Sequence, residues 1–339
     1  MKLIVDAMGG DNAPGEIVRG ALSAAAKDAS IELVFCGDEK AITDAMNDAP
    51  TPLNPPEIVP AASQIAMEDD PLCILKSKKD SSMAVGLCLL RDGKGDAFLT
   101  AGSTGALIVG VSSRIYQLKI RGVRRCVIGA VLPFTSPCLL LDSGANVVVS
   151  PEELVQFAQM GSLYMQGVFN RESPTVGLIN NGAEETKGSP LYAQAHALLK
   201  EEKSIHFIGN VEGRDIPLGV ADVLVCDGFV GNVILKLSEG FGKFFKKELK
   251  GLFLRGIRGP LAGLLLRGRL ASWKESLSYE KYGAAPVLGT TRPVLKAHGS
   301  SMKKAIENAV FQAKKCYESR ICDATCAISA TAEQGGDKQ

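Results

Sequence analysis

Residues 1–47, which decide the fold class, read MKLIVDAMGGDNAPGEIVRGALSAAAKDASIELVFCGDEKAITDAMN. Short apolar runs at residues 2–8 and 31–36 alternate with helical patterns at residues 14–28 and 40–47. This alternation is typical of βαβ units, in which helices cover a parallel sheet. The sequence therefore predicts an α/β fold from its first residues.

The same alternation continues along the chain. Further strands are predicted at residues 97–100, 126–132, 138–141, 175–179, 205–208 and 223–226. Further helices are predicted at residues 103–116, 151–165, 190–199 and 301–319. Because the chain has no internal repeat and no long low-complexity linker, we expect residues 1–331 to form one α/β domain. The small, polar residues 332–339 are expected to form a flexible tail.

The composition excludes several classes of protein. Lys and Arg number 38 against 37 Asp and Glu, so the net charge gives no reason to expect nucleic-acid binding. No apolar run reaches the length of a membrane-spanning helix or a signal peptide, so a cytoplasmic protein is expected. Nine cysteines and three histidines argue against a closed disulfide framework and a His-rich metal site.

Small-residue turns follow five of the predicted strands. Strand ends of a parallel sheet bring together unpaired N–H groups and helix dipoles, which bind anions. Each turn alone has a plainer interpretation as a glycine turn with a helix cap, but five together predict an anion site. Neither a G-x-G-x-x-G fingerprint nor a Walker A motif is present, so a small anion is expected. The turns are Asp6–Asp11, Ala101–Gly105, Asp142–Asn146, Asn180–Gly182 and Asp227–Asn232.

Six sequence blocks, in register from residue 1 to about residue 320, resemble the PlsX-type phosphate acyltransferases of bacterial phospholipid synthesis. One departure is Ser103, because the family often has Gly-Asn-Thr-Gly where this chain has Gly-Ser-Thr-Gly. The blocks are VDAMGGD (5–11), KKDSSM (78–83), AGSTGAL (101–107), LDSGAN (141–146), DGFVGNV (227–233) and KAHGSS (296–301).

The resemblance implies a Rossmann-like α/β/α sandwich similar to isopropylmalate dehydrogenases and phosphotransacetylases. It also implies a homodimer that transfers a fatty acyl group from acyl carrier protein to inorganic phosphate, without a metal or an organic cofactor. The catalytic residues implied by the family pattern are Lys187 and Asn232. The candidate substrate- and phosphate-binding residues are Asp6, Gly9, Gly10, Ser103, Thr104, Gly105, Asp142, Asn146, Asn181, Gly231 and His298.

The residue types suit this chemistry. Attack of phosphate on a thioester builds negative charge on the carbonyl oxygen, so the site needs positive charge and fixed hydrogen-bond donors. Lys187 can supply the charge and Asn232 an amide donor, while phosphate needs no strong base and leaves His298 an auxiliary role. The plainer interpretations are a solvated lysine, a helix cap and a turn residue.

Residues 243–274 form a basic, leucine-rich segment in which nine Lys and Arg accompany one acid, Glu248. Glycine and proline at residues 256–260 predict a protruding helical hairpin over about residues 232–275. Its leucines either pack at a dimer interface or enter anionic lipid while the lysines meet acyl carrier protein. The residues concerned are Lys243, Lys246, Lys247, Lys250, Leu254, Arg255, Ile257, Arg258, Leu261 and Leu265.

Peripheral attachment to the inner face of the cell membrane would bring the product to a membrane glycerol-phosphate acyltransferase. Two alternatives stay open from the sequence. One is an NAD- and metal-dependent decarboxylating dehydrogenase of the same fold, which would need clustered aspartates and an arginine clamp. The other is a non-catalytic membrane-associated scaffold that uses the basic segment to recruit partners.

Overall fold

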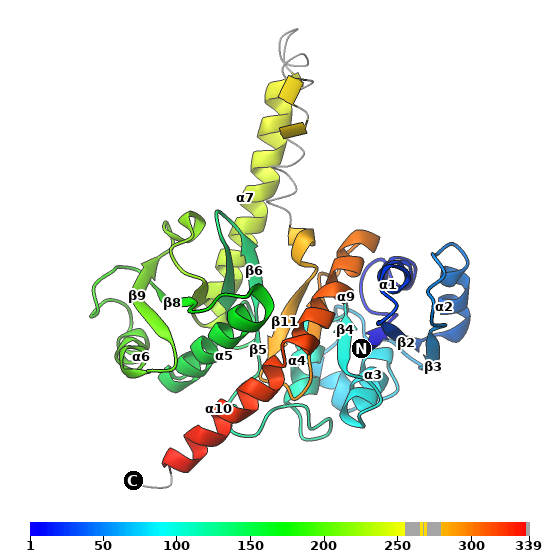
Figure 1. Ribbon diagram of the computed structural model, residues 1–339, viewed down its shortest axis with the longest axis horizontal. Helices are drawn as coiled ribbons and strands as arrows, with labels where there is room; N and C mark the ends of the chain where they lie inside the picture. The colour runs from blue at the N-terminus through cyan, green and yellow to red at the C-terminus, as the bar shows by residue number, and fades with distance from the viewer. Residues whose placement is uncertain (255–264, 267, 270–278, 337–339) are drawn as a thin grey trace.

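The computed structural model describes residues 1–254, 265–266, 268–269 and 279–336. Two mixed β-sheets with helices on their faces confirm the α/β class (Figure 1). Within these residues, short 3₁₀ helices lie at Pro71–Leu75, Ile216–Leu218 and Tyr279–Tyr282.

The first sheet has seven strands, and its central strands are parallel. Strands β3, β2, β1, β4 and β12 run in one direction, whereas β11 is antiparallel to both β12 and β5. The carboxyl ends of β1, β4 and β12 therefore lie side by side at one edge. In spatial order the strands are β3 (Glu57–Pro60), β2 (Glu32–Gly37), β1 (Lys2–Asp6), β4 (Ala97–Thr100), β12 (Val294–Ala297), β11 (Ala284–Leu288) and β5 (Val127–Ile128).

The second sheet has five strands with the same kind of parallel centre. β7, β10, β8 and β9 are parallel, and β6 is antiparallel to β7. The ends of β7, β10 and β8 thus form a second row of loops. In spatial order the strands are β6 (Ala130–Pro133), β7 (Pro137–Leu141), β10 (Val223–Val225), β8 (Thr175–Asn180) and β9 (His206–Glu212).

Helices cover both faces of each sheet because alternate strand residues point to opposite sides. In β1, Leu3 and Val5 join a core cluster with α1 and α9, whereas Ile4 joins a second cluster with α3 and α4. On the second sheet α5 covers one face, and Ile234 and Leu235 of α7 pack against the other. The helices are α1 (Gly15–Lys27), α2 (Glu39–Met46), α3 (Ser82–Arg91), α4 (Thr104–Ser112), α5 (Pro151–Phe169), α6 (Pro190–Glu201), α7 (Gly228–Leu254), α9 (Lys303–Glu318) and α10 (Ile321–Gly336).

The strand predicted at residues 126–132 is wrong as a single element. It breaks at Gly129, so that β5 belongs to the first sheet and β6 to the second. The Gly129 N–H bonds to the carbonyl of Pro286, and a Cβ there would press on the side chains of Leu139 and Leu141. An apolar run alone does not reveal such a crossing, because both halves are equally buried.

Helix α7 is the element that leaves the body of the molecule (Figure 1). It begins at Gly228, ends at Leu254 within the described part, and carries the first arm of the predicted hairpin. Arg255, Ile257, Arg258 and Leu261 lie outside the described residues, so the predicted tip remains a prediction. Leu265 is described and its side chain is exposed. None of the described helices is long and apolar enough to cross a bilayer.

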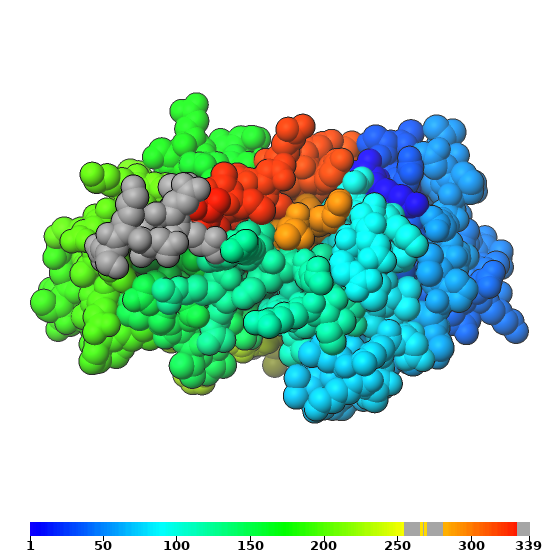
Figure 2. All heavy atoms as spheres, turned by 90° about the horizontal axis from the view of Figure 1, so that it is seen from below, coloured from blue at the N-terminus to red at the C-terminus, as the bar shows by residue number. Residues whose placement is uncertain are grey.

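Helix α10 packs on α5 and crosses the face opposite to the α7 projection, where it lies between the N-terminal part and the central part of the chain (Figure 2). Its backbone is helical through Gly336, and residues 337–339 lie outside the described residues. The flexible tail therefore stays a prediction.

Candidate active site

The first group of candidate residues lies where β1, β4 and β12 end. The Asp6 carboxylate accepts a hydrogen bond from the Thr100 hydroxyl (2.7 Å) and a longer one from the Met8 N–H (3.3 Å). Gly9 and Gly10 let the 6–11 loop press against the 100–105 loop, since a Cβ at Gly9 would lie 2.6 Å from Asp6 Oδ2. Burial raises the pKa of Asp6, although hydrogen bonds from Ser82, Thr100 and Met8 oppose the shift.

Lys296, the third residue of β12, is a buried cation in this group. Its ammonium donates hydrogen bonds to the carbonyl oxygens of Ala101 (3.3 Å) and Ala297 (2.5 Å). Burial lowers the pKa of Lys296 to about 8, and the nearby carboxylates of Asp6 and Asp11 only partly offset this. A lysine in this state is poised between charged and neutral forms near physiological pH.

The 101–105 loop leads into α4, and its hydroxyl side chains lie at the start of that helix. Ser103 is the N-cap, and its Oγ accepts the N–H of Ala106 (3.4 Å). Thr104 and Gly105 are the first residues of α4, and Gly105 packs against Pro71. The structure therefore gives Ser103 a capping bond and leaves the N-terminus of α4 next to the Asp6 group.

The loop after β12 closes over the same strand ends. The Asp11 N–H donates to the carbonyl of Gly299 (2.8 Å), and His298 Nδ1 lies 2.9 Å from the Ser300 hydroxyl. Burial lowers the pKa of His298; the Glu239 carboxylate opposes this, and Lys236 adds to it. The charges of two α7 residues, Lys236 and Glu239, thus act on a loop of the first sheet.

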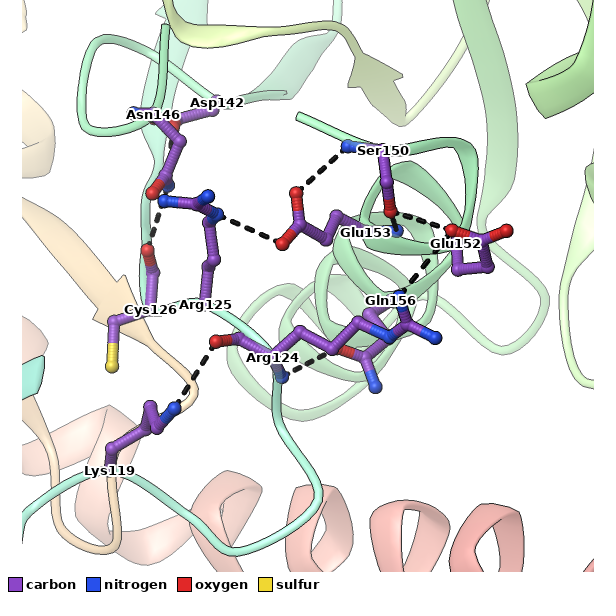
Figure 3. Close-up of polar contacts among 10 residues, drawn as sticks. All are labelled: Lys119, Arg124, Arg125, Cys126, Asp142, Asn146, Ser150, Glu152, Glu153 and Gln156. Carbon is purple, nitrogen blue, oxygen red and sulfur yellow. Dashed lines mark hydrogen bonds and ion pairs between the residues drawn. The ribbon is translucent and has the colours of Figure 1, made fainter. Parts of the chain in front are cut away.

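The second group surrounds the end of β7. The Asp142 carboxylate accepts the N–H groups of Gly144 (2.9 Å), Ala145 (2.9 Å) and Asn146 (2.6 Å) together with the Asn146 side-chain amide (2.8 Å). The same Asn146 amide donates to the carbonyl of Cys126 (2.9 Å), as Figure 3 shows. Burial raises the pKa of Asp142 against these bonds. Asp142 and Asn146 thus hold their own loop together.

This loop is anchored to α5 through the segment before β5. Arg125, which precedes Cys126, pairs with Glu153 (2.9 Å), and Glu153 belongs to the capping box that starts α5 with Ser150 (Figure 3). The Asp142 loop is therefore held to the segment before β5, which is itself held to α5.

Helix α7 starts directly on the Asp142 loop. The Asp227 carboxylate caps it by accepting the N–H groups of Phe229 and Val230, and it also accepts the Tyr192 hydroxyl (2.7 Å). Gly231 packs so closely on the Asp142 carbonyl that no side chain fits there. Asn232 follows, and its amide makes one long bond, 3.4 Å, to the carbonyl of Ser143. A weak resting bond leaves this amide available as a donor.

Lys187 lies in the exposed loop after β8. The loop is closed by the Asn180 amide, which donates to the Lys187 carbonyl (3.1 Å), while Gly182 leaves room for the Lys187 side chain. Asn181 and Lys187 are both exposed. The structure thus places Lys187 and Asn181 beside the end of β8, and Asn232 beside the ends of β7 and β10, which are neighbouring strands.

Helix α7 connects the two groups. Asn232, Lys236 and Glu239 are spaced so that they share one face of the helix. Asn232 contacts the second sheet's loops, while the charges of Lys236 and Glu239 act on His298 and Lys236 also acts on Lys296. The candidate site is therefore the region where both rows of strand-end loops meet the start of α7.

Sequence reasoning missed Thr100, Tyr192, Lys236 and Lys296. Lys296 opens the KAHGSS block, so the block pointed to it, but nothing in the sequence marks this lysine as buried. Tyr192 and Lys236 sit in ordinary helical patterns and carry no signal. Among the described residues, no cluster of three or more His, Cys, Asp or Glu side chains is arranged to hold a metal ion.

Comparison with known proteins decides the family. A family model described as "Fatty acid synthesis protein" matches residues 1–324. A phosphate acyltransferase of Acetivibrio thermocellus is 42% identical over 325 residues, covering 95% of both chains. One from Thermoanaerobacter pseudethanolicus is 44% identical over 322 residues, again covering 95% of both. The chain belongs to the phosphate acyltransferase family.

Solved structures agree on the fold. A phosphotransacetylase from Streptococcus pyogenes has a TM-score of 0.59 at 14% identity and covers 93% of this chain and 94% of its own. A branched-chain phosphotransacylase from Enterococcus faecalis has a TM-score of 0.56 at 16% identity, covering 94% and 99%. At these identities the likeness concerns the fold alone, and it confirms the phosphotransacetylase-like architecture expected of the phosphate acyltransferase family.

Proposed function

We propose that this phosphate acyltransferase moves a fatty acyl group from acyl carrier protein to inorganic phosphate and so makes acyl phosphate for phosphatidic acid and phospholipid synthesis. The observation that carries the proposal is the meeting of two rows of strand-end loops at α7, where Asn232 contacts the loops of the second sheet and Lys236 acts on Lys296 in the first. The loops of the first sheet suit a phosphate, and the loops of the second sheet suit a thioester. Family membership supports the same reaction.

The proposed step is a direct transfer. A phosphate oxygen attacks the thioester carbonyl, the C–O bond forms, the C–S bond breaks, and the thiol of the carrier leaves with a proton. The Asn232 amide donates to the carbonyl oxygen as it gains negative charge, and the Lys187 ammonium balances the charge of the approaching phosphate. Burial is the main cause that raises the pKa of all nine cysteine thiols, which argues against a cysteine nucleophile.

The test is to incubate the pure protein with palmitoyl-acyl carrier protein and labelled phosphate. Acyl phosphate carrying the label supports the proposal. Release of free fatty acid without labelled acyl phosphate would contradict it. A parallel assay with candidate hydroxy acids, NAD and magnesium tests the dehydrogenase, for which production of NADH would be the signature.

The proposed assembly is a homodimer that covers the apolar stripe of α7. The stripe repeats every three or four residues along the helix and its side chains are about half or more exposed in the single chain, an arrangement that a monomer rarely leaves in water. It consists of Phe229, Val233, Leu237, Phe241 and Phe244. Light scattering should give a dimer for the wild type and a smaller mass for Phe241→Glu with Phe244→Glu. A dimer in both would remove the stripe from the interface.

We also propose that the segment beyond α7 attaches to anionic lipid. Lys243, Lys246, Lys247 and Lys250 are exposed on the outer half of α7, where they can meet acidic lipid or acyl carrier protein. Each basic residue near an anionic surface contributes roughly 1 kcal/mol, which gives reversible, salt-sensitive binding.

Vesicle flotation tests the lipid contact. The wild type should float with anionic vesicles at low salt, and a variant with Leu254→Glu, Leu261→Glu and Leu265→Glu should not, while keeping its activity on the carrier-bound substrate. Equal flotation of both proteins would assign the segment to the dimer. Wild-type flotation with no turnover on any acyl carrier protein thioester would instead favour the scaffold.

A further inference from the structure

We propose that Lys296 supplies the buried positive charge that binds the phosphate substrate, a role that rests on the proposed acyl transfer to phosphate. Lys296 is 7% exposed and lies in β12 opposite Thr100 of β4. Its ammonium lies beneath two loops, because it bonds to Ala101 in one and to Ala297 at the start of the other. These are the loops that lead into α4 and into the HGSS turn.

The neighbours of the Lys296 ammonium do not satisfy all of its N–H groups or its charge. It has three N–H groups, and among the described residues only the two carbonyl oxygens accept from it. It forms no ion pair with a described carboxylate. Among the nearby charges, that of Asp6 has the largest effect on the pKa of Lys296. The Asp6 carboxylate already accepts hydrogen bonds from Thr100 and Met8. A buried lysine without an ion pair is costly to the fold, so its retention calls for a bound anion or another function.

The surroundings favour an anion beside this ammonium. Ala101, which accepts from Lys296, stands two residues before the N-cap of α4, so the positive end of that helix dipole is close by. The Thr104 and Gly105 N–H groups, the first two of α4, have no acceptor among the described residues. A helix N-terminus and an incompletely bonded ammonium together match the oxygens of a phosphate.

The charged groups that face Lys296 come from four elements. They are Asp6 at the end of β1, Asp11 in the loop that follows, Lys236 on α7 and His298 in the loop after β12. The two carboxylates favour the charged ammonium, whereas burial and Lys236 disfavour it and hold its pKa at about 8. As pH rises through about 8, the Lys296 ammonium of the free protein loses its positive charge. Phosphate keeps its negative charge over this range.

The expected pH dependence is therefore specific. For a single deprotonation, kcat/KM for phosphate should fall about tenfold for each pH unit above the pKa of the free protein. The KM for the acyl carrier protein thioester should change much less over the same range. If Lys296 only supported the fold, the kinetic constants for phosphate and for the thioester would change together with pH.

The decisive experiment measures both KM values for the wild type, Lys296→Met and the control Lys315→Met, which replaces an exposed lysine of α9. At neutral pH, Lys296→Met should lower kcat/KM for phosphate by about 30-fold or more, the scale of losing a charged hydrogen-bond partner. Its alkaline decline should disappear. Lys315→Met should match the wild type.

A double variant distinguishes substrate binding from simple charge balance. If Lys296 only neutralises Asp6, then Asp6→Asn combined with Lys296→Met should restore the wild-type KM for phosphate, and the inference is wrong. If Lys296 serves phosphate, the double variant should remain impaired. An unchanged phosphate KM in Lys296→Met also overturns the inference.

A thermal-shift measurement on the wild type covers the case in which the variants do not fold. Inorganic phosphate should raise the melting temperature at about pH 7 and much less at about pH 9.5. Equal shifts at both pH values would contradict the role of Lys296. If the wild type shows the pH-dependent shift but makes no acyl phosphate, the proposed function fails while the phosphate site stands.

Discussion

Replacing Asp142 with Asn tests whether this residue holds the loop that supports α7. One carboxylate oxygen accepts the N–H groups of Gly144 and Ala145, and the other accepts two N–H groups of Asn146. An asparagine can keep one pair, but its NH₂ group then faces the other pair of donors. Two hydrogen bonds are lost and buried donors are left without acceptors.

The structure sets the size of the effect. Two lost hydrogen bonds and the desolvation of unpaired donors should reduce the free energy of unfolding by about 2–4 kcal/mol. For a chain of 339 residues this corresponds to a fall in melting temperature of about 3–6 °C. The loop also accepts the Gly228 N–H (2.8 Å) and the Asn232 amide, so α7 should shift at its start. A misplacement of about 1 Å costs up to about 10²-fold in turnover.

Thermal unfolding and phosphate-dependent turnover of Asp142→Asn are compared with Asp48→Asn, which changes an exposed aspartate. We expect lower stability and a lower kcat in the first variant and neither effect in the second. If Asp142→Asn keeps the wild-type melting temperature and binds phosphate more tightly, Asp142 faces the substrate. The loop-holding role would then be refuted.

Three other outcomes are expected. Lys187→Ala and Asn232→Ala should each lower turnover by about 10²-fold while leaving the fold intact, and wild-type rates in a folded variant would remove that residue from the mechanism. Phosphate should raise the melting temperature, whereas EDTA and magnesium should leave turnover unchanged; loss of activity on chelation, restored by one metal, would contradict this. Burial raises the pKa of Glu307, but bonds from Lys27, Lys304 and Ser23 outweigh it and hold that pKa at about 2. Its contribution to stability is present above about pH 4.5 and lost as pH falls through about 2, so Glu307→Gln should be less stable than the wild type at neutral pH by about 1–3 kcal/mol, and the difference should vanish in strong acid.

The sequence predicts the α/β class and most central elements because alternating apolar runs report burial directly. The helix predicted at residues 301–319 is observed as Lys303–Glu318, and the strand at residues 97–100 is observed as Ala97–Thr100. The splitting of the chain into two sheets at Gly129 is not predictable in this way, because it depends on which strands lie on either side. The strands β3, β11 and β12 are not among the predicted ones either.

The candidate site divides in a similar way. The glycine-rich turns point correctly to strand ends that the topology brings together, since local sequence records where a backbone must turn. The environment of a side chain, by contrast, depends on residues that are far away in the sequence. Lys296 is buried by loops far away in sequence, and Lys236 reaches His298 only because α7 passes that loop. Asp142, expected at the anion, is bonded within its own turn, and its contact with substrate stays a prediction.

The most direct measurement of the central claim follows the label from phosphate. The wild type, Asn232→Ala and Lys315→Met are each mixed with palmitoyl-acyl carrier protein and labelled phosphate, and the acyl phosphate is trapped and counted. The account predicts labelled acyl phosphate and free carrier thiol in equal amounts for the wild type and the Lys315 control, and about 10²-fold less for Asn232→Ala. Carrier thiol released without labelled acyl phosphate in the wild type would contradict it.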